Sequence, residues 1–454
     1  MGSSLPLAIS HLTAARAQMT VSMAFHIIFA AIGIGLPLLM VIAEHRYLKT
    51  GREHYLKLTK KWARATGLLF AIGAVSGTAL SFELGLLWPR YMEITGAAVG
   101  HLFGLEGFAF FIEAIFIGLY LYGWDKLKPR AHWWCGVVIA ASGAISGVLV
   151  LGVNAWMQQP VGFTMNAEGQ VAGTQPLAIF ATQAWWTMAL HSTLASYIAL
   201  GFAVAAVYAG GYLRGKRDDY HRSAIRIGIM VGGVCALLQI VSGDAIAKFV
   251  FKTQPAKFAA MEAHLHTTTH APIRIGGIYD PATNQVRHGL EIPAMLSFLA
   301  ADDFNTEVKG LNDIPRDLWP NVNVTHVAFD VMVGCGSLLA LVAMVFMYLW
   351  WRRGDAVFER RWLVRAIWLC GSLGFIAVEA GWIVTEAGRQ PWVINGILKT
   401  ADAVTPAANV VPVFIGYCVL YTVLGVMCVL LLRHITRDKP EDDSTEAKQN
   451  LTYA

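Results

Sequence analysis

Long apolar runs recur along this 454-residue chain, and they constrain its fold more than any other feature. A helix needs about 20 apolar residues to cross about 30 Å of hydrocarbon. A soluble protein of this size would instead show amphipathic stripes broken by charges. The predicted spans are 19–42, 65–87, 101–123, 133–153, 184–209, 225–248, 326–351, 362–386 and 408–433. The sequence therefore predicts an all-α membrane protein with about nine transmembrane helices.

The basic residues are distributed unevenly between the two sides of these spans. If the N-terminus lies outside, the outer side holds only Arg16, Arg90, Arg389 and Lys399, apart from the long segment 249–324. Cytoplasmic loops carry the excess of Lys and Arg, so we expect an outer N-terminus and a cytoplasmic C-terminus. The net charge of +5 reflects this bias and gives no reason to expect a nucleic-acid partner.

Segment 249–324 breaks the pattern of short loops and contains six prolines: Pro255, Pro272, Pro281, Pro293, Pro315 and Pro320. A loop of this length is usually functional or disordered, and its apolar patches favour a folded cap outside the membrane. The predicted organisation is 1–248 for six helices, 249–324 for the cap, 325–435 for three helices and 436–454 for a flexible cytoplasmic tail.

Three side chains deep in the spans are potential haem ligands: His26, His191 and Met332. Neutral imidazole is the commonest ligand of haem iron. A lone intramembrane histidine is equally well explained as a hydrogen-bonded helix contact, and methionine fills cores everywhere. All three lie a few turns from the outer ends of their spans, where Glu386 also arrives. We therefore predict four potential axial ligands at one depth in the outer half of the bilayer.

Carboxylates in the third span and in the cap suggest proton chemistry. Glu106 and Glu113 are seven residues apart and share a helix face, so they either relay protons or bond neighbouring helices. Lys257 and Glu262 could bond the oxygens of a quinol and take its protons. The alternative for this pair is a solvated amphipathic helix. Glu386 and Arg389 put two ionisable groups beside the outer membrane surface, which is costly unless they are paired or functional.

Several stretches, in the same order along nearly the whole chain, resemble subunit I of the cytochrome bd family of quinol oxidases. The matching stretches are 25–26, 107–113, 122–125, 154–160, 191–193, 254–262, 332–336 and 379–392. The resemblance implies a quinol:oxygen oxidoreductase, a terminal oxidase of an aerobic respiratory chain in the bacterial inner membrane. It would oxidise quinol at the outer face and reduce dioxygen to water with protons taken from the cytoplasm.

The resemblance also implies roles for single residues. His191 and Met332 would hold a low-spin haem b, with Asn154 near its propionates. His26 and Glu386 would be the axial ligands of a high-spin haem b and a haem d, in an order that differs within the family.

Of the remaining matches, Glu106 would lie beside the oxygen-reducing haem and Glu113 on the proton path. Lys257 and Glu262 would form the quinol pair. Arg389 matches the arginine that meets the haem propionates, and Trp382 lies in the same signature as a further cofactor-binding residue. Expected partners are subunit II, membrane quinone and dioxygen, with a small single-span third subunit as an open addition.

Three departures from the family pattern leave questions open. The carboxylates of the third span are eight apart in many members and seven here, so Glu106 could face the haem differently. Asp330 replaces an arginine two residues before Met332, so we expect a lower redox potential of the low-spin haem than in arginine-bearing relatives. The short loop, of the cyanide-insensitive-oxidase type, leaves open the quinone and whether the third haem is d or b.

Two other classes of protein compete with this interpretation. A transporter would have discontinuous helices near the midplane and inverted repeats, which the sequence does not indicate. An electron-transfer cytochrome b would carry pairs of histidines along the same helices, whereas only His26 and His191 lie deep in spans here.

Overall fold

The computed structural model describes residues 10–407 and 409–436. Nine helices in this described part are long and apolar enough to cross a membrane, which confirms the predicted fold class. The chain divides into two compact units. Unit 1 consists of Met1–Ala97, Phe108–Gly143 and Ala401–Ala454, and unit 2 consists of Ala98–Gly107 and Ala144–Thr400. The predicted flexible tail lies almost wholly outside the described residues.

The membrane-spanning helices are longer than the apolar runs that predicted them, because their ends continue into polar residues. They are α1 (His11–Thr50), α2 (Glu53–Leu87), α3 (Pro89–Tyr122), α4 (Pro129–Gln158), α5 (Gln183–Leu213), α6 (Asp219–Thr253), α9 (Val322–Arg353), α10 (Arg361–Leu369) continued by α11 (Leu373–Ala387), and α13 (Val410–Thr436). Side chains of Ser10, Thr182, Asp218 and Asn321 cap α1, α5, α6 and α9 by accepting from first-turn N–H groups.

Unit 1 contains α1, α2, α13 and most of α3 and the first half of α4. A buried polar network joins three of these helices. The Tyr120 hydroxyl donates to Glu44, His132 Nδ1 lies 2.7 Å from Glu44 Oε1, and His132 Nε2 lies 2.9 Å from Tyr120 O. Glu44 on α1 is thereby bonded from both α3 and α4. Buried charges need such partners, so this network fixes how the three helices meet.

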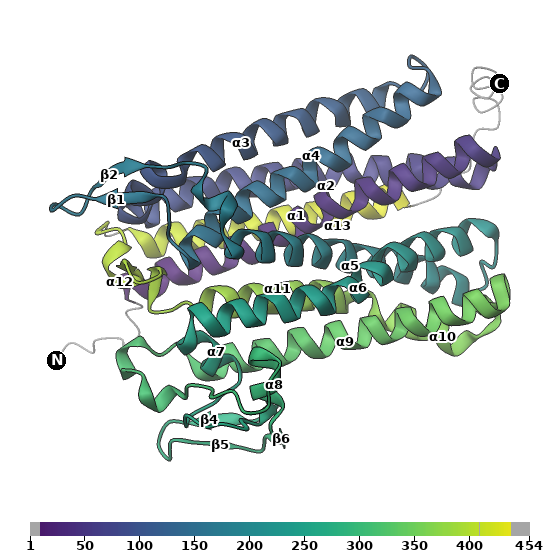
Figure 1. Cartoon of the computed structure of the whole chain (residues 1–454). Helices are drawn as coiled ribbons and strands as arrows, with labels where there is room; N and C mark the ends of the chain where they lie inside the picture. Colours follow the sequence, from purple (N-terminus) through teal and green to yellow (C-terminus); the bar gives the residue numbers. More distant parts are fainter. Residues whose placement is uncertain (1–9, 408, 437–454) are drawn as a thin grey trace, which may run out of the picture. The chain divides into compact units, whose positions relative to one another are not determined.

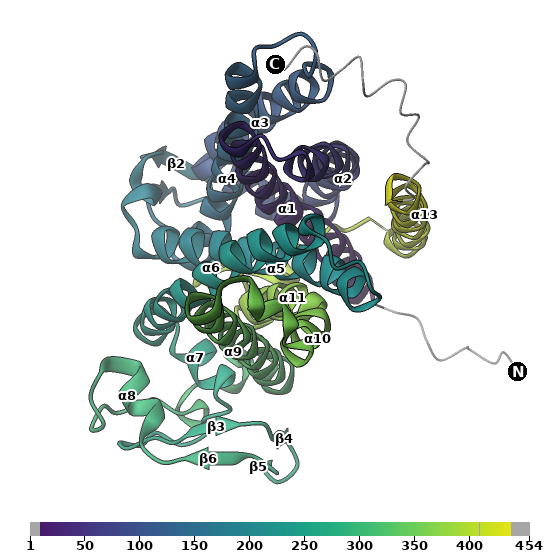
Figure 2. The same ribbon diagram turned by 90° about the vertical axis from the view of Figure 1, so that its right-hand side faces the viewer.

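Unit 2 is built around α5 and α6, which lie side by side along their lengths (Figure 1). Their backbones meet at Gly201 and Gly228. A Cβ added at Gly228 would lie 2.5 Å from Gly201 O, and one added at Gly201 would lie 2.6 Å from Gly228 O. Only glycine permits this approach, which is typical of helix pairs in membranes. Helices α9 and α11 pack against this pair (Figure 2).

The predicted cap is folded, and it lies at one end of α6 and α9 (Figure 1). It contains α7 (Pro255–Met261), α8 (Met295–Ala301) and two antiparallel ladders, β3 (Ile273–Ile275) with β6 (Leu290–Ile292) and β4 (Ile278–Asp280) with β5 (Gln285–Arg287). Its own apolar core is formed by Ala259, Ala260, Ala263, Leu265, Tyr279, Leu311 and Val322. Burial of these side chains explains why so polar a segment is ordered.

The remaining elements are short and connect the helices. They are β1 (Phe163–Met165), β2 (Val171–Thr174), β7 (Trp392–Ile394), β8 (Leu398–Lys399), α12 (Thr400–Ala403) and the 3₁₀ turns η1 (Ala178–Ala181), η2 (Leu311–Asp313), η3 (Arg316–Leu318), η4 (Gly354–Glu359) and η5 (Cys370–Ser372). Strands β1 and β2 form a hairpin between α4 and α5, which the sequence did not predict.

The glycine contact of α5 and α6 gives a test of the fold. We expect Gly228→Ala to destabilise the purified protein by about 1–3 kcal/mol, because the added methyl group meets backbone atoms that cannot yield. Gly416→Ala on α13 is the control, since nothing lies within 4 Å of a Cβ added there. Thermal unfolding should show a lower Tm for Gly228→Ala only. Equal Tm values for the two variants would contradict the close contact.

Candidate functional site

The predicted site residues are divided between the two units. Unit 1 holds His26 on α1 and Glu113 on α3. Unit 2 holds Glu106, Asn154, His191, Lys257, Glu262, Met332, Trp382, Glu386 and Arg389. His26 lies in unit 1, and the other three potential axial ligands lie in unit 2. The expectation that all four share one depth in the membrane therefore stays a prediction.

His191 on α5 has one ring nitrogen engaged by a serine of α6. Its Nδ1 lies 3.1 Å from Ser242 Oγ. Ser242 Oγ donates its own hydrogen to Gln239 O at 3.1 Å, so it accepts from His191. The imidazole proton therefore sits on Nδ1, and Nε2 presents a lone pair. A histidine that binds a metal is usually oriented in this way by a partner on its other nitrogen.

His26 on α1 has the same arrangement with a serine of α2. Its Nδ1 lies 3.0 Å from Ser76 Oγ, which donates to Gly73 O at 3.1 Å. The ring packs against Gly77, where an added Cβ would lie 2.8 Å from His26 Cε1. Both deep histidines therefore present Nε2 as the nitrogen able to bind a metal.

Met332 on α9 lies against a glycine of α11. A Cβ added at Gly381 would lie 3.0 Å from Met332 Sδ, so the bare backbone makes room for the thioether. Trp382 follows on α11 and is partly buried. Helix α11 packs against both α5 and α9, so His191 and Met332 come from the two helices that flank α11. A thioether and a neutral imidazole form a known pair of axial ligands for haem iron.

Glu386, near the end of α11, is bonded by two polar residues. Asn154 Nδ2 donates to Glu386 Oε1 at 2.6 Å, and Arg389 Nη2 donates to Glu386 Oε2. Arg389 is only 4% exposed, yet its Nε and Nη1 have no hydrogen-bond partner, and neither has Asn154 Oδ1. Buried donors are seldom left unbonded, so this guanidinium has capacity for a further anion.

Lys257 on α7 reaches the same cluster. Its Nζ lies 3.5 Å from both Gln158 Oε1 and Thr385 O. Burial first, and then the charge of Arg389, lower the pKa of Lys257 to about 7 against the opposing charge of Glu386. Every residue from Lys257 to Met261 is buried, so the alternative of a solvated amphipathic helix is wrong.

Glu262 follows α7 directly and is 5% exposed. Burial raises the pKa of Glu262 to about 8, the charge of Asp330 raises it too, and Arg274 opposes the rise. A carboxyl group that titrates near neutral pH can both donate and accept protons there. Lys257 and Glu262 are thus two buried groups whose pKa values have moved toward neutrality from opposite directions.

Asp330, the residue that departs from the family pattern, bonds the cap. Its Oδ2 accepts from Gly276 N at 2.7 Å and lies 3.6 Å from His326 Nε2. The His326 ring lies between two cap carbonyls, with Nδ1 2.7 Å from Met261 O and Nε2 2.9 Å from Gly276 O. Asp330 and His326 therefore tie α9 to the cap.

The two carboxylates of α3 both lie against α4. Ser146 Oγ donates to Glu106 Oε1 at 3.1 Å within unit 2. Glu113, 4% exposed, lies in unit 1 beside glycines: a Cβ at Gly143 would come within 3.1 Å of its Oε1, and one at Gly33 within 4.0 Å. The glycines leave space around the carboxylate on the sides facing α4 and α1.

Sequence reasoning missed Ser76 and Ser242, which orient the histidines. No local sequence pattern marks these serines, because each one bonds a histidine on the preceding helix. It also missed Glu83, a buried residue of α2 that accepts from Gln18 Nε2 at 3.1 Å and from Ser22 Oγ at 2.8 Å. A carboxylate inside the second predicted span was a usable signal for that site.

A hollow of about 500 Å³ lies on the cap, and Lys257 and Glu262 do not line it. It is lined by Phe251, Lys252, Pro255, Phe258, Thr267, Glu307, Lys309 and Asp313. The two buried groups are therefore not part of this hollow.

Comparisons with known proteins identify the family of this chain. The family described as Cytochrome bd terminal oxidase subunit I matches residues 14–440. The putative cytochrome bd menaquinol oxidase subunit I of Bacillus subtilis (strain 168) is 36% identical over 447 residues, covering 97% of this chain and 99% of the relative. The cytochrome bd ubiquinol oxidase subunit 1 of the same organism is 31% identical, covering 96% of this chain and 95% of the relative.

A solved structure is similar over the same extent. The bd oxidase from Geobacillus thermodenitrificans superposes with a TM-score of 0.89 at 34% sequence identity, covering 95% of this chain and 99% of that one. The sequence comparison and the structure comparison thus point to the same family and cover nearly the same part of the chain. The chain therefore belongs to the family of cytochrome bd terminal oxidase subunit I.

Proposed function

We propose that this chain is the quinol-oxidising and oxygen-reducing subunit of a bacterial inner-membrane terminal oxidase. Family membership supports a quinol oxidase with oxygen as acceptor and haem as cofactor. The observation that carries the proposal furthest is the matched pair His26–Ser76 and His191–Ser242. In each pair a serine fixes the imidazole proton on Nδ1 and leaves Nε2 for iron.

His191 and Met332 hold a low-spin haem b in this proposal. His26 and Glu386 are the axial ligands of a high-spin haem b and of a third haem, d or b, in an order that stays open. Bound haem would supply electron transfer and an open coordination position for dioxygen.

Arg389, Asn154 and Trp382 complete the cofactor site. The unused donors of Arg389 suit the propionates of a haem, which are anions. Both oxygens of Glu386 are already bonded, one by Asn154 and one by Arg389. Each of these oxygens has a second lone pair, so Glu386 could bind iron while Asn154 and Arg389 remain bonded to it.

Lys257 and Glu262 act on quinol at the outer face, with 249–324 as the quinol-binding segment. A neutral lysine and an ionised carboxylate can each accept a proton as quinol is oxidised. Their pKa values of about 7 and about 8 make both forms available near neutral pH. The relatives are named for menaquinol or ubiquinol, so the quinone stays open here.

Glu113 and Glu106 carry protons from the cytoplasm, with the N-terminus outside and the C-terminus inside. Carboxylates on one helix can pass protons through a region that excludes water. Electrons from outside then meet protons from inside, and charge is separated without a pump. Subunit II completes the enzyme, as the family implies, and a small single-span third subunit would be an addition to it.

A reduced-minus-oxidised spectrum with and without carbon monoxide tests this function. We expect haem bands of which a part responds to carbon monoxide, because one iron has an open position. A transporter would give no bands. An electron-transfer cytochrome b would give bands insensitive to carbon monoxide, and either result would overturn the proposal.

The serine that orients His191 can be tested by spectroscopy. We expect Ser242→Ala to lose part of the low-spin haem, since the loss of such a partner typically weakens metal binding 10–100-fold. Met332→Leu removes a ligand outright and sets the scale of the full effect. Ser196→Ala on α5 is the control, because Ser196 bonds only within its own helix at Ser192 O. An unchanged low-spin spectrum in Ser242→Ala would contradict the orienting role.

The proton path gives a separate prediction. We expect Glu113→Ala to retain its haems and lose oxygen consumption, because the carboxylate between α1 and α4 is gone. The control is Glu93→Ala, an exposed carboxylate of α3 paired with Arg90 at 2.7 Å. Normal oxygen consumption by Glu113→Ala would reject the path.

The pH dependence of quinol oxidation tests Glu262. Its ionised form accepts the proton and is populated as pH rises through about 8, so kcat/KM should increase on the order of ten-fold between about pH 7 and about pH 9. Asp330 on α9 and Arg274 on β3 are the charged groups that act on it. Glu262→Gln should abolish the rise, whereas Asp303→Asn, an exposed change on the cap, should keep it. A rise that survives in Glu262→Gln would exclude this assignment.

A further inference from the structure

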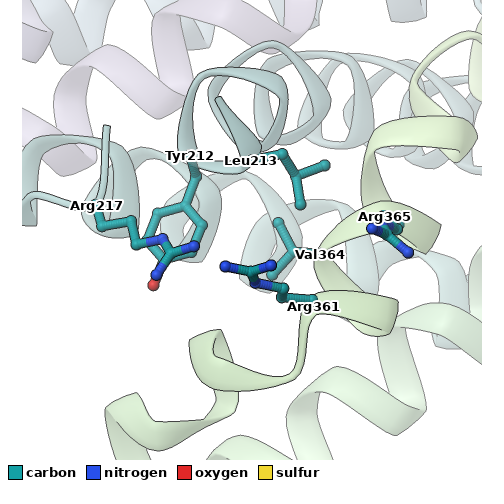
Figure 3. Close-up of a pocket in the computed structure, with 6 residues that line it drawn as sticks. All are labelled: Tyr212, Leu213, Arg217, Arg361, Val364 and Arg365. Atoms are coloured by element: carbon teal, nitrogen blue, oxygen red, sulfur yellow. The ribbon is translucent and has the colours of Figure 1, made fainter. Parts of the chain in front are cut away.

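A second polar site lies in unit 2, far along the helices from the cap. It is a pocket of about 90 Å³ lined by Tyr212, Leu213, Arg217, Arg361, Val364 and Arg365 (Figure 3). Tyr212 and Leu213 end α5, and the other residues come from the following loop and from α10. The α10 end of unit 2 lies opposite the cap in Figure 1.

The charge of this pocket is one-sided. Arg361 and Arg365 are one helical turn apart on α10; the side chains of Arg217 and Arg361 extend toward each other, and Arg365 lies beyond Val364 (Figure 3). Among the described residues, none of these three guanidinium groups forms an ion pair. Positive charges close to one another repel and so destabilise the protein, and a bound anion removes this repulsion.

Neighbouring arginines show that carboxylates were available nearby. Arg226 Nη2 pairs with Asp355 Oδ1 at 2.9 Å, and Arg222 lies 3.9 Å from Asp219 Oδ1. The three arginines that line the pocket form no such pair among the described residues. An arginine binds phosphate through two parallel N–H donors, so the group that fits three such residues is a phosphate.

The surroundings resemble a membrane surface. Leu213 and Val364 give the pocket an apolar wall. On the same helical segment, Trp362 is 56% exposed and Trp368 is 53% exposed. Exposed tryptophan at the end of a spanning helix is typical of the level of lipid headgroups. The concentration of Lys and Arg assigns this end to the cytoplasmic leaflet, whose anionic lipids attract basic pockets.

We propose that this pocket binds the phosphate of an anionic phospholipid of the inner leaflet. Arg217, Arg361 and Arg365 contact the phosphodiester, and Leu213 and Val364 contact the start of its acyl chains. Free phosphate would use the arginines but would gain nothing from the apolar wall. The site is separate from the quinol and haem residues and does not depend on them.

Native mass spectrometry of the purified oxidase, titrated with phosphatidylglycerol, tests this site. The variant Arg217→Gln, Arg361→Gln, Arg365→Gln should lose one tight binding event, with affinity lower on the order of 100-fold, because each basic residue near a membrane contributes a factor of about five. The matched control Lys126→Gln, Lys128→Gln, Arg130→Gln removes the same charge from another predicted inner loop and should keep that event.

Further measurements separate the possible outcomes. Phosphatidylcholine should not occupy the site, and inorganic phosphate should not displace phosphatidylglycerol. Equal loss in both triple variants would show non-specific attraction, and displacement by phosphate would show a site for a free anion; either result overturns the proposal. If the triple variant does not fold, Arg365→Gln alone should weaken binding about five-fold. An unchanged affinity in that variant would also overturn it.

Discussion

A polar group in hydrocarbon has no water to bond, so each one needs a partner inside the protein. This constraint organises both units. Glu83 is bonded by two side chains of α1, and Glu44 is bonded from α3 and α4. The same rule gives each deep histidine a serine on the adjacent helix. Polar contacts between helices therefore also fix the ring orientations on which the proposed metal binding would depend.

The cap and the membrane helices meet through buried polar groups. Lys257 bonds Gln158 and the backbone of α11, while Asp330 and His326 bond the cap from α9. Burial without water shifts the titration of Lys257 and Glu262 toward neutral pH. The cap is thus an integral part of unit 2, and its attachment creates the environment that makes these two groups suitable for proton transfer.

Much of this arrangement could be predicted from the sequence. Apolar runs predicted the nine spans, and the patches of segment 249–324 predicted a folded cap. Single residues such as His191 and Glu386 stood out because their types are rare at membrane depth. Ser242 did not, since a serine in a helix is common and its role depends on which helices are neighbours. The burial of Lys257 was equally hidden, because charge and loop position favoured exposure.

The contact of Gly201 with Gly228 has a consequence for electron transfer. Backbones that touch cannot slide past one another without a clash, so this contact opposes movement of α5 along α6. His191 and the serine that orients it are carried on these two helices. As the proposed haem ligand, His191 would keep nearly the same position in both oxidation states, and such preorganisation would keep the reorganisation energy of electron transfer small. Two glycines about three to four helical turns away would in this way favour rapid exchange of single electrons.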